Sequence, residues 1–320
     1  MTVVRWSHNL RSMRTLRDKT IVITGAASGI GRALAIQAAG EGARLALSDI
    51  DRVGLEATAR MCGGPADVRV DRLDVADREA WARYARSVSE SHGTTNVIVN
   101  NAGVALSSNV VDMSYDDFEW LMGINFWGVI HGTKTFLPQL IESGDGHVVN
   151  ISSLFGLMSV PSQSAYNAAK FGVRGFTEAL RMEMHVAGHP VGVTCVHPGG
   201  IKTAIARNAR GDAHHDAAEL AADFDANLAR TTPEAAAAQI WSAVRRNKAR
   251  ALIGPDAKLL DLLVRVTGSG YQRLVARTSK PSASLTSPVD DREVGPRPVD
   301  DGDTRPRSRG ASECAECRPQ

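Results

Sequence analysis

The chain has 320 residues, of which 43% are hydrophobic and 22% charged, and its formal net charge is +2. These values are ordinary for a globular protein and exclude the strongly basic field that nucleic-acid binding requires. No apolar run reaches the roughly 18 residues that span a bilayer, which argues against an integral membrane segment. Four cysteines in this length form no disulfide framework, so we expect a reducing, cytoplasmic setting.

The first 18 residues are rich in arginine and poor in acid. Organelle transit segments share that composition, but no amphipathic period is sustained here. We therefore interpret residues 1–18 as a flexible basic extension, with the fold beginning as early as Met13.

From Thr20 onward, β-branched strand patterns alternate with helical patterns. Strands are predicted, in chain order, at 20–25, 43–49, 68–75, 96–103, 147–153, 191–200 and 250–254. Helices are predicted at 31–42, 78–91, 115–143 and 165–186. Strands joined by helices of this length form right-handed βαβ crossovers. We therefore predict one α/β domain at 19–278, a Rossmann-like, doubly wound parallel sheet with helices on both faces.

Two parts of the chain depart from this alternation. Residues 201–232 are alanine-rich and predict one or two small helices rather than a strand, and we expect about 204–232 to form a lid over the substrate. In residues 279–320 Pro, Ser, Asp and Arg dominate, so this tail is predicted to be disordered. Its CAEC sequence, from Cys314 to Cys317, has redox-motif spacing but neither a βαβ context nor a second pair for zinc.

The stretch KLLDLLVRV (258–266) extends the helical pattern past the last strand. Basic residues follow through Arg277, as in helices that contact a membrane surface or a hydrophobic substrate. Burial in the core or in an interface is the favoured interpretation of this helix.

A glycine-rich turn, TGAASGIG (Thr24 to Gly31), follows the first strand and opens a helix. In such a turn the backbone N–H groups approach a pyrophosphate, and the helix dipole favours its negative charge. Asp49 ends the second strand, where a carboxylate can accept hydrogen bonds from the ribose hydroxyls and repel a 2′-phosphate. We therefore expect NAD(H), while Arg52, just past that strand, leaves NADP(H) open.

Polar residues also stand at the ends of the third and fourth strands. Asp74, with Val75, follows the third strand, and NNAG (Asn100 to Gly103) follows the fourth. Ligands of open α/β sheets bind at the carboxyl ends of the strands, where Asp74 can meet the adenine amino group. Either feature alone is ordinary turn chemistry, but their order along the chain favours a cofactor site.

From about Lys19 to Gly254 the chain resembles the short-chain dehydrogenase/reductase family, the branch with TGxxxGIG and YxxxK motifs. The motifs occur in the family's order: TGAASGIG, NNAG, the asparagine of GINFWG, NISS, YNAAK and HPGG. This set is specific for the family and unspecific for the substrate. One departure is Ala169, where many members carry serine, and it bears no reacting group.

The side chains of these motifs suit alcohol oxidation. A phenol is a poor base at neutral pH, but an ammonium one helical turn away favours the phenolate, so Lys170 is expected to lower the working pKa of Tyr166. Ser153 can hydrogen-bond the reacting oxygen; strand alternation puts Ser152 on the opposite face, and the family's spacing favours Ser153. The resemblance assigns Asn125 to hold the lysine through a water.

The resemblance implies that NAD(H) or NADP(H) transfers the hydride. The predicted cofactor contacts are Gly25, Ala27, Ser28, Gly29, Ile30, Gly31, Asp49, Asp74, Val75, Asn101, Ala102, Gly103, Tyr166, Lys170, Pro198, Gly199, Ile201 and Thr203. The predicted substrate pocket contains Ser153, Leu154, Phe155, Gln163 and Tyr166, with Met158 nearby. This lining is mainly apolar, so we expect a neutral, fairly apolar secondary alcohol or ketone. No metal is expected, because His197, His214 and His215 lack ligand-spaced partners.

The helical segments 115–140 and 165–186 carry apolar residues over more than one face. They fit a homodimer or homotetramer, as the family forms, and burial against the sheet fits them equally well. Two other functions stay open: a dinucleotide-binding scaffold or redox sensor without turnover, and an interaction protein that acts through its tail. The retained tyrosine and lysine argue against loss of turnover.

Overall fold

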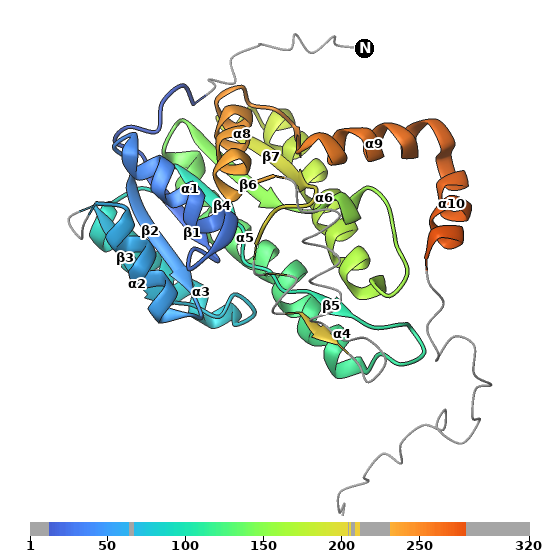
Figure 1. Ribbon diagram of the computed structural model, residues 1–320. Coiled ribbons are helices and arrows are strands. Elements are labelled where there is room, and N and C mark those ends of the chain that lie inside the picture. The colour runs from blue at the N-terminus through green and yellow to red at the C-terminus, as the bar shows by residue number, and fades with distance from the viewer. Residues whose placement is uncertain (1–12, 64–66, 204, 206–208, 212–230, 280–320) are drawn as a thin grey trace, which may run out of the picture. The chain divides into compact units, whose positions relative to one another are not determined.

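Seven strands pair into one parallel sheet with the strand order β3-β2-β1-β4-β6-β7-β9 (Figure 1). In this computed structural model the described residues are 13–63, 67–203, 205, 209–211 and 231–279. The strands are β1 Thr20–Thr24, β2 Arg44–Asp49, β3 Val68–Arg72, β4 Val97–Asn100, β6 Gly146–Ile151, β7 Val191–Pro198 and β9 Arg250–Ile253. From β1 the chain adds β2 and β3 on one side of the sheet and then returns to add β4, β6, β7 and β9 on the other side. Open α/β sheets bind ligands at such a switch in strand order, here between β1 and β4.

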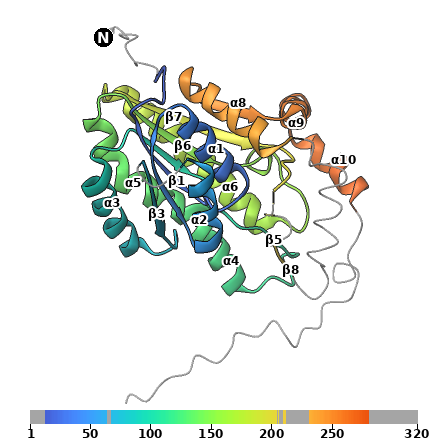
Figure 2. The same ribbon diagram turned by 60° about the vertical axis from the view of Figure 1, so that its left-hand side comes forward.

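Helices cover both faces of this sheet, as predicted (Figures 1 and 2). One face packs against α1 (Gly29–Gly40), α2 (Arg52–Met61) and α8 (Pro233–Arg245). The other packs against α3 (Arg78–His92), α5 (Gly128–Glu142) and α6 (Ser164–Val186). Alternation along β1 serves both layers, because Ile21 and Ile23 join the first core and Val22 joins the second.

The helix predicted at 115–143 is interrupted by a π-helical turn. α4 (Tyr115–Met122) leads into this turn, η1 (Gly123–Trp127), which leads into α5. Asn125 lies in the turn and is fully buried. Its Oδ1 accepts from the Val104 N–H and its Nδ2 donates to the Val104 carbonyl, both at 2.8 Å. The irregular turn is therefore fastened to the chain just beyond β4, and such turns are frequent at functional sites.

A short strand replaces part of the alanine-rich segment that was predicted to be helical. β5 (Leu106–Ser107) pairs in parallel with β8 (Arg210–Gly211), which corrects the expectation of no strand between 201 and 232. The Arg210 guanidinium also lies 3.7 Å from the centre of the Trp120 ring and forms an ion pair with Asp117 at 3.0 Å. These contacts fix β8 against α4.

Several predicted features fall outside the described residues. They are residues 1–12, the helices expected within 212–229 and with them most of the lid, His214, His215, and the tail 280–320 with Cys314 and Cys317. Met13 and Leu16, just before β1, are buried in the same apolar core as residues of α1 and α8.

The described chain ends in helices beyond β9. These are α9 (Pro255–Thr267), the 3₁₀ turn η3 (Gly268–Gly270) and α10 (Tyr271–Thr278), drawn in orange in Figure 1. Within the described ranges, none of the helices combines the length and apolarity needed to cross a bilayer.

Candidate active site

Glycines shape the turn between β1 and α1. Gly25 and Gly29 have φ angles of +65° and +54°, which residues with a Cβ rarely adopt. A Cβ on Gly31 would collide with the Gly25 carbonyl oxygen, so the first turn of α1 packs directly on the loop. The Asn101 Nδ2 donates to the carbonyls of Thr24 at 2.9 Å and Gly25 at 3.1 Å. Asn101, predicted as a cofactor contact, thus holds the loop backbone in place.

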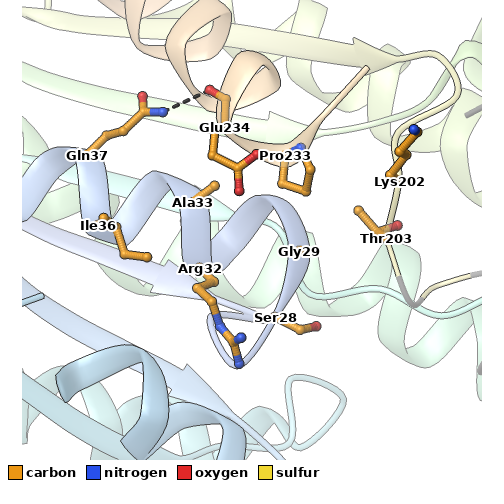
Figure 3. A pocket seen from close by; sticks show the side chains of 10 residues that line it. All are labelled: Ser28, Gly29, Arg32, Ala33, Ile36, Gln37, Lys202, Thr203, Pro233 and Glu234. Atoms are coloured by element: carbon orange, nitrogen blue, oxygen red, sulfur yellow. Dashed lines mark hydrogen bonds between the residues drawn. The ribbon is translucent and has the colours of Figure 1, made fainter. Parts of the chain in front are cut away.

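The N-terminus of α1 fits an anionic group. Ser28 is its N-cap, yet the Ser28 side chain makes no capping hydrogen bond and the first turn holds no acid. By contrast, Asp51 and Asp77 cap α2 and α3 with their carboxylates. The N–H groups and the dipole of α1 therefore favour a negative charge such as the diphosphate of a dinucleotide. Figure 3 shows Ser28 and Thr203 among the residues that line a pocket at this helix end.

Asp49 is fixed beside this loop at the end of β2. Its Oδ2 accepts from the Ala27 N–H at 2.9 Å and its Oδ1 from the Asp51 N–H at 3.0 Å. Each carboxylate oxygen keeps a further lone pair for a ribose hydroxyl. Arg52 is engaged elsewhere, because its Nε pairs with Glu56 at 2.9 Å on the exposed surface.

The end of β3 lies next to the end of β2. The Leu73 N–H donates to the Asp49 carbonyl at 3.0 Å. Asp74 is exposed, and its Oδ1 accepts from the Ala76 N–H at 2.9 Å, while Val75 is buried against Gly128. Asp74 and Val75, both predicted as cofactor contacts, therefore stand beside the Asp49 site.

Three predicted catalytic side chains meet at the carboxyl end of β6. Helix α6 carries Tyr166 and Lys170 one turn apart, and the Lys170 Nζ lies 5.5 Å from the centre of the Tyr166 ring. Lys170 is buried, and its Nζ donates to the Ile151 carbonyl at 3.1 Å. The side chain of Ser153 stands beside that of Tyr166 and lowers the pKa of the phenol, and its hydroxyl accepts from the Phe155 N–H at 3.1 Å.

The two adjacent serines play different roles. The Ser152 hydroxyl donates to the Lys170 carbonyl at 2.8 Å and fixes α6, so Ser153 is the serine that faces the tyrosine. The Ser153 carbonyl is 2.8 Å from Nδ1 of His197, which is fully buried in β7. Burial lowers the pKa of His197 to about 4, so its ring is neutral at physiological pH.

Burial dominates the protonation of the tyrosine and the lysine. It raises the pKa of Tyr166, and the hydrogen bond from Ser153 only partly opposes that rise. It lowers the pKa of Lys170 to about 8. Loss of water around the phenol thus holds the proton on Tyr166 at neutral pH.

Asn125 and Lys170 converge on Gly103. A Cβ at Gly103 would lie 3.2 Å from the Asn125 Oδ1 and 3.6 Å from the Lys170 Nζ. The last glycine of NNAG therefore leaves the space in which the π-helical turn and the lysine approach each other.

The segment after β7 reaches back to the glycine-rich loop. The Gly199 N–H donates to the Ile253 carbonyl at 3.0 Å, and the Gly200 N–H donates to the Asp256 Oδ2 at 2.6 Å. Ile201 is buried, and the Thr203 Cγ2 lies 3.1 Å from where a Gly29 Cβ would stand. Thr203 thus lies beside the N-terminus of α1, while Gly199 and Gly200 are held by the chain at the end of β9 and the start of α9.

The apolar members of the predicted substrate pocket form a wall at the 3₁₀ turn η2 (Leu154–Gly156), which contacts Tyr166 through Phe155. Leu154 and Phe155 belong to this turn, and the Phe155 ring meets the Tyr166 ring edge-on at 6.2 Å. Met158 extends this wall, and Gln163 is the N-cap of α6. Tyr271 of α10 completes the cluster, and its hydroxyl accepts from the Ser159 N–H at 3.0 Å.

Four residues of this region were missed from the sequence: Tyr271, Asp256, Arg32 and Lys202. Arg32 and Lys202 line the pocket at the glycine-rich loop (Figure 3), and the Arg32 Nε donates to the Thr58 Oγ1 at 3.0 Å. Both stand next to residues already singled out: Arg32 directly follows GIG, and Lys202 lies between Ile201 and Thr203. Tyr271 and Asp256 lie beyond the motifs, where the sequence carries no comparable signal.

Comparisons with known proteins agree with this geometry. Residues 19–214 match the family model described as short chain dehydrogenase. The Mycobacterium tuberculosis protein named as oxidoreductase SadH is 55% identical over 265 residues, which cover 82% of this chain and 96% of that protein. A short-chain dehydrogenase/reductase from Burkholderia phymatum, solved with NAD, has a TM-score of 0.74 at 28% identity and covers 84% and 99% of the two chains. A short chain dehydrogenase from Mycobacterium paratuberculosis, solved with bound NAD, has a TM-score of 0.63 at 26% identity. The match covers 74% of this chain and 96% of that one.

Proposed function

The chain belongs to the short-chain dehydrogenase/reductase family, and from that we propose that it interconverts a secondary alcohol and a ketone with Tyr166 as general acid and base. The observation that carries this proposal is the meeting of Tyr166, Ser153 and Lys170 at one strand end. The glycine-rich loop and the uncapped N-terminus of α1 supply a place for the nicotinamide dinucleotide that the family uses.

The residues of the chain handle the proton. A nicotinamide dinucleotide, when bound, supplies the acceptor or donor of the hydride. Ser153, which stands beside Tyr166, orients the substrate oxygen, and Tyr166 gives its proton to that oxygen in reduction and takes it back in oxidation. With a pKa of about 8, Lys170 is mostly an ammonium at neutral pH and stabilises the phenolate that forms.

NAD(H) is the favoured cofactor. Asp49 is held by two backbone N–H groups at the position that reads the ribose, and its charge opposes a 2′-phosphate. The ion pair between Arg52 and Glu56 weakens the case for Arg52 as a phosphate ligand. The apolar wall of Leu154, Phe155 and Met158 favours a neutral, fairly apolar substrate.

The test is a hydride-transfer screen over alcohols and ketones with NAD and NADP, run beside Tyr166→Phe. We expect turnover of apolar secondary alcohols or their ketones with NAD(H). Tyr166→Phe should lower kcat by about 10²–10⁴-fold while NADH affinity is kept. Full activity of Tyr166→Phe would refute the acid–base role, and turnover of sugar phosphates alone would refute the substrate class. A wild type that binds NADH and reduces nothing would instead be a dinucleotide-binding scaffold.

We also propose that the protein forms a homodimer or homotetramer through α4–η1–α5 and α6. Large apolar side chains are exposed along these helices: Tyr115, Phe118, Trp127, Phe171, Met182 and Val186. Acidic residues such as Asp116, Glu119 and Glu183 stand between them, which suits a protein partner with a polar rim.

A further inference from the structure

Helix α9 has apolar residues on two opposite faces. Ala257, Leu260 and Val264 face the body of the fold, where Leu260 and Val264 pack beside η2. Leu259, Leu262 and Val266 follow one another at three- and four-residue spacing and are 67%, 59% and 77% exposed. The inner face of α9 is already covered by the fold, so this exposed outer row calls for a partner of its own.

Helix α10 continues the same arrangement. Its Tyr271 and Val275 pack inward, while Leu274 is 51% exposed. Figures 1 and 2 show α9 and α10 together at the margin of the fold. We call the outward side chains of these helices the C-terminal surface: Leu259, Leu262, Val266 and Leu274 with the exposed cations Lys258, Arg265, Arg273 and Arg277.

The charge of this surface has one sign. All four of these cations stand beside the apolar row, whereas the two acids of the helices are turned inward. Asp261 is buried and pairs with Arg250 and Arg265, and Asp256 accepts the Gly200 N–H. Apolar side chains flanked by cations are the pattern of helices that lie in the interface of an anionic bilayer.

We propose that the C-terminal surface docks the protein onto an anionic lipid bilayer, with its four apolar side chains inserted among the acyl chains and its cations at the headgroups. A second copy of the chain fits less well. A two-fold contact would set like charges against each other, and four side chains fall far short of the roughly 800 Å² per partner of a standard interface. The apolar side chains exposed on α4 to α6 differ from the C-terminal surface because acidic residues lie among them, which does not suit an anionic bilayer.

Docking in this way places the bilayer next to the substrate wall. The inner faces of α9 and α10 share one apolar cluster with Leu154, Met158 and Phe155, and Phe155 touches Tyr166. A substrate that partitions into lipid would then meet the enzyme at the wall that receives it, a consequence that rests on the proposed function.

The experiment is flotation of the full chain with phosphatidylcholine vesicles, with or without phosphatidylglycerol, in the absence of any substrate. We expect binding to the anionic vesicles alone, weakened by salt. Leu262→Ser should weaken it by about tenfold, because one large apolar anchor is lost. Lys258→Gln should weaken it by about fivefold, the effect of one cation near an anionic surface. Met61→Ser and Arg60→Gln on α2, which are similarly exposed, should bind as the wild type does.

Light scattering gives the oligomer mass of the same variants and so shows whether the C-terminal surface binds a bilayer or another protein chain. Binding to neutral vesicles alone, no binding at all, or binding unchanged by Leu262→Ser would overturn the proposal. So would a smaller oligomer for Leu262→Ser, which would make the C-terminal surface a protein interface. Because no turnover is measured, failure of the proposed chemistry leaves this result intact.

Discussion

Lys170 reduces the stability of the fold that it serves. Burial lowers its pKa from 10.5 to about 8, so the unfolded chain binds more protons between those two values. The free energy of unfolding therefore rises with pH across that window, and below it the buried ammonium costs about 3 kcal/mol.

We predict that Lys170→Met abolishes turnover yet stabilises the dinucleotide-free protein by about 2 kcal/mol at pH 7, after loss of the hydrogen bond to Ile151 is deducted. The gain should shrink as the pH rises, pass through zero at about pH 10 and become a loss of about 1 kcal/mol above 10.5, where only the lost hydrogen bond remains. Urea unfolding of both proteins across this range measures it. A variant less stable than the wild type at pH 7 would show that the lysine is stabilised when charged.

Gly31 and Gly40 offer a matched pair on one helix. A Cβ at Gly31 would overlap the Gly25 carbonyl, whereas a Cβ at Gly40 meets nothing within 4 Å. We predict that Gly31→Ala shifts the loop and weakens NADH binding by at least about tenfold, because the backbone can no longer close on the cofactor. Gly40→Ala should bind normally and gain about 0.5–1 kcal/mol of stability. Fluorescence titration with NADH measures the affinity of both variants, and thermal unfolding measures their stability. Equal NADH affinities of Gly31→Ala and Gly40→Ala would contradict this role of Gly31.

At the level of elements, the π-helical turn depends on one side chain. Asn125 satisfies both the N–H and the carbonyl of Val104 inside the fold. Asn125→Ala leaves these two groups without partners, so we predict a loss of about 2–4 kcal/mol in the free energy of unfolding, together with a lower kcat. Urea unfolding and steady-state kinetics on one preparation measure both. An unchanged stability would mean that water replaces the amide.

The parallel strands and most helices could be predicted because their signals are local. The helix predicted at 165–186 is observed at 164–186, and the strand at 191–200 ends only two residues earlier. Helix α2 escaped prediction, since its ten residues include a glycine and lack a long apolar row. The β5–β8 pair depends on two dipeptides about 100 residues apart, so only the tertiary fold defines it.

At the scale of the whole molecule, the site could be predicted as far as its motifs reach. Tyr166, Ser153 and Lys170 meet as their motifs imply, because motif residues at strand ends converge on one edge of a parallel sheet. Burial could not be predicted in this way. Only the folded chain shows that loss of water around Tyr166 raises its pKa, and only there do Tyr271 and Asp256 reach the site.

Assembly belongs to the same scale. We predict that Met182→Glu, at a position 63% exposed on α6, shifts the protein toward smaller species, because a carboxylate would be buried without a partner. Met61→Glu on α2, where the side chain is 56% exposed, should not change the mass. Light scattering over a concentration series measures both, and identical masses would direct the search for the interface to other helices.

The π-helical turn also sets the phase of the two helices that it joins. A turn with i to i+5 bonding takes one residue more than an α-helical turn, which rotates everything after it by about 100°. Leu121 of α4 therefore packs toward α6 and β5, while Phe136 and Leu140 of α5 pack on the sheet. Deleting one residue from this turn would restore a regular helix and aim one of the two apolar rows at solvent. The π-helical turn therefore allows α4 and α5, which follow one another without a loop, to pack into two different apolar clusters.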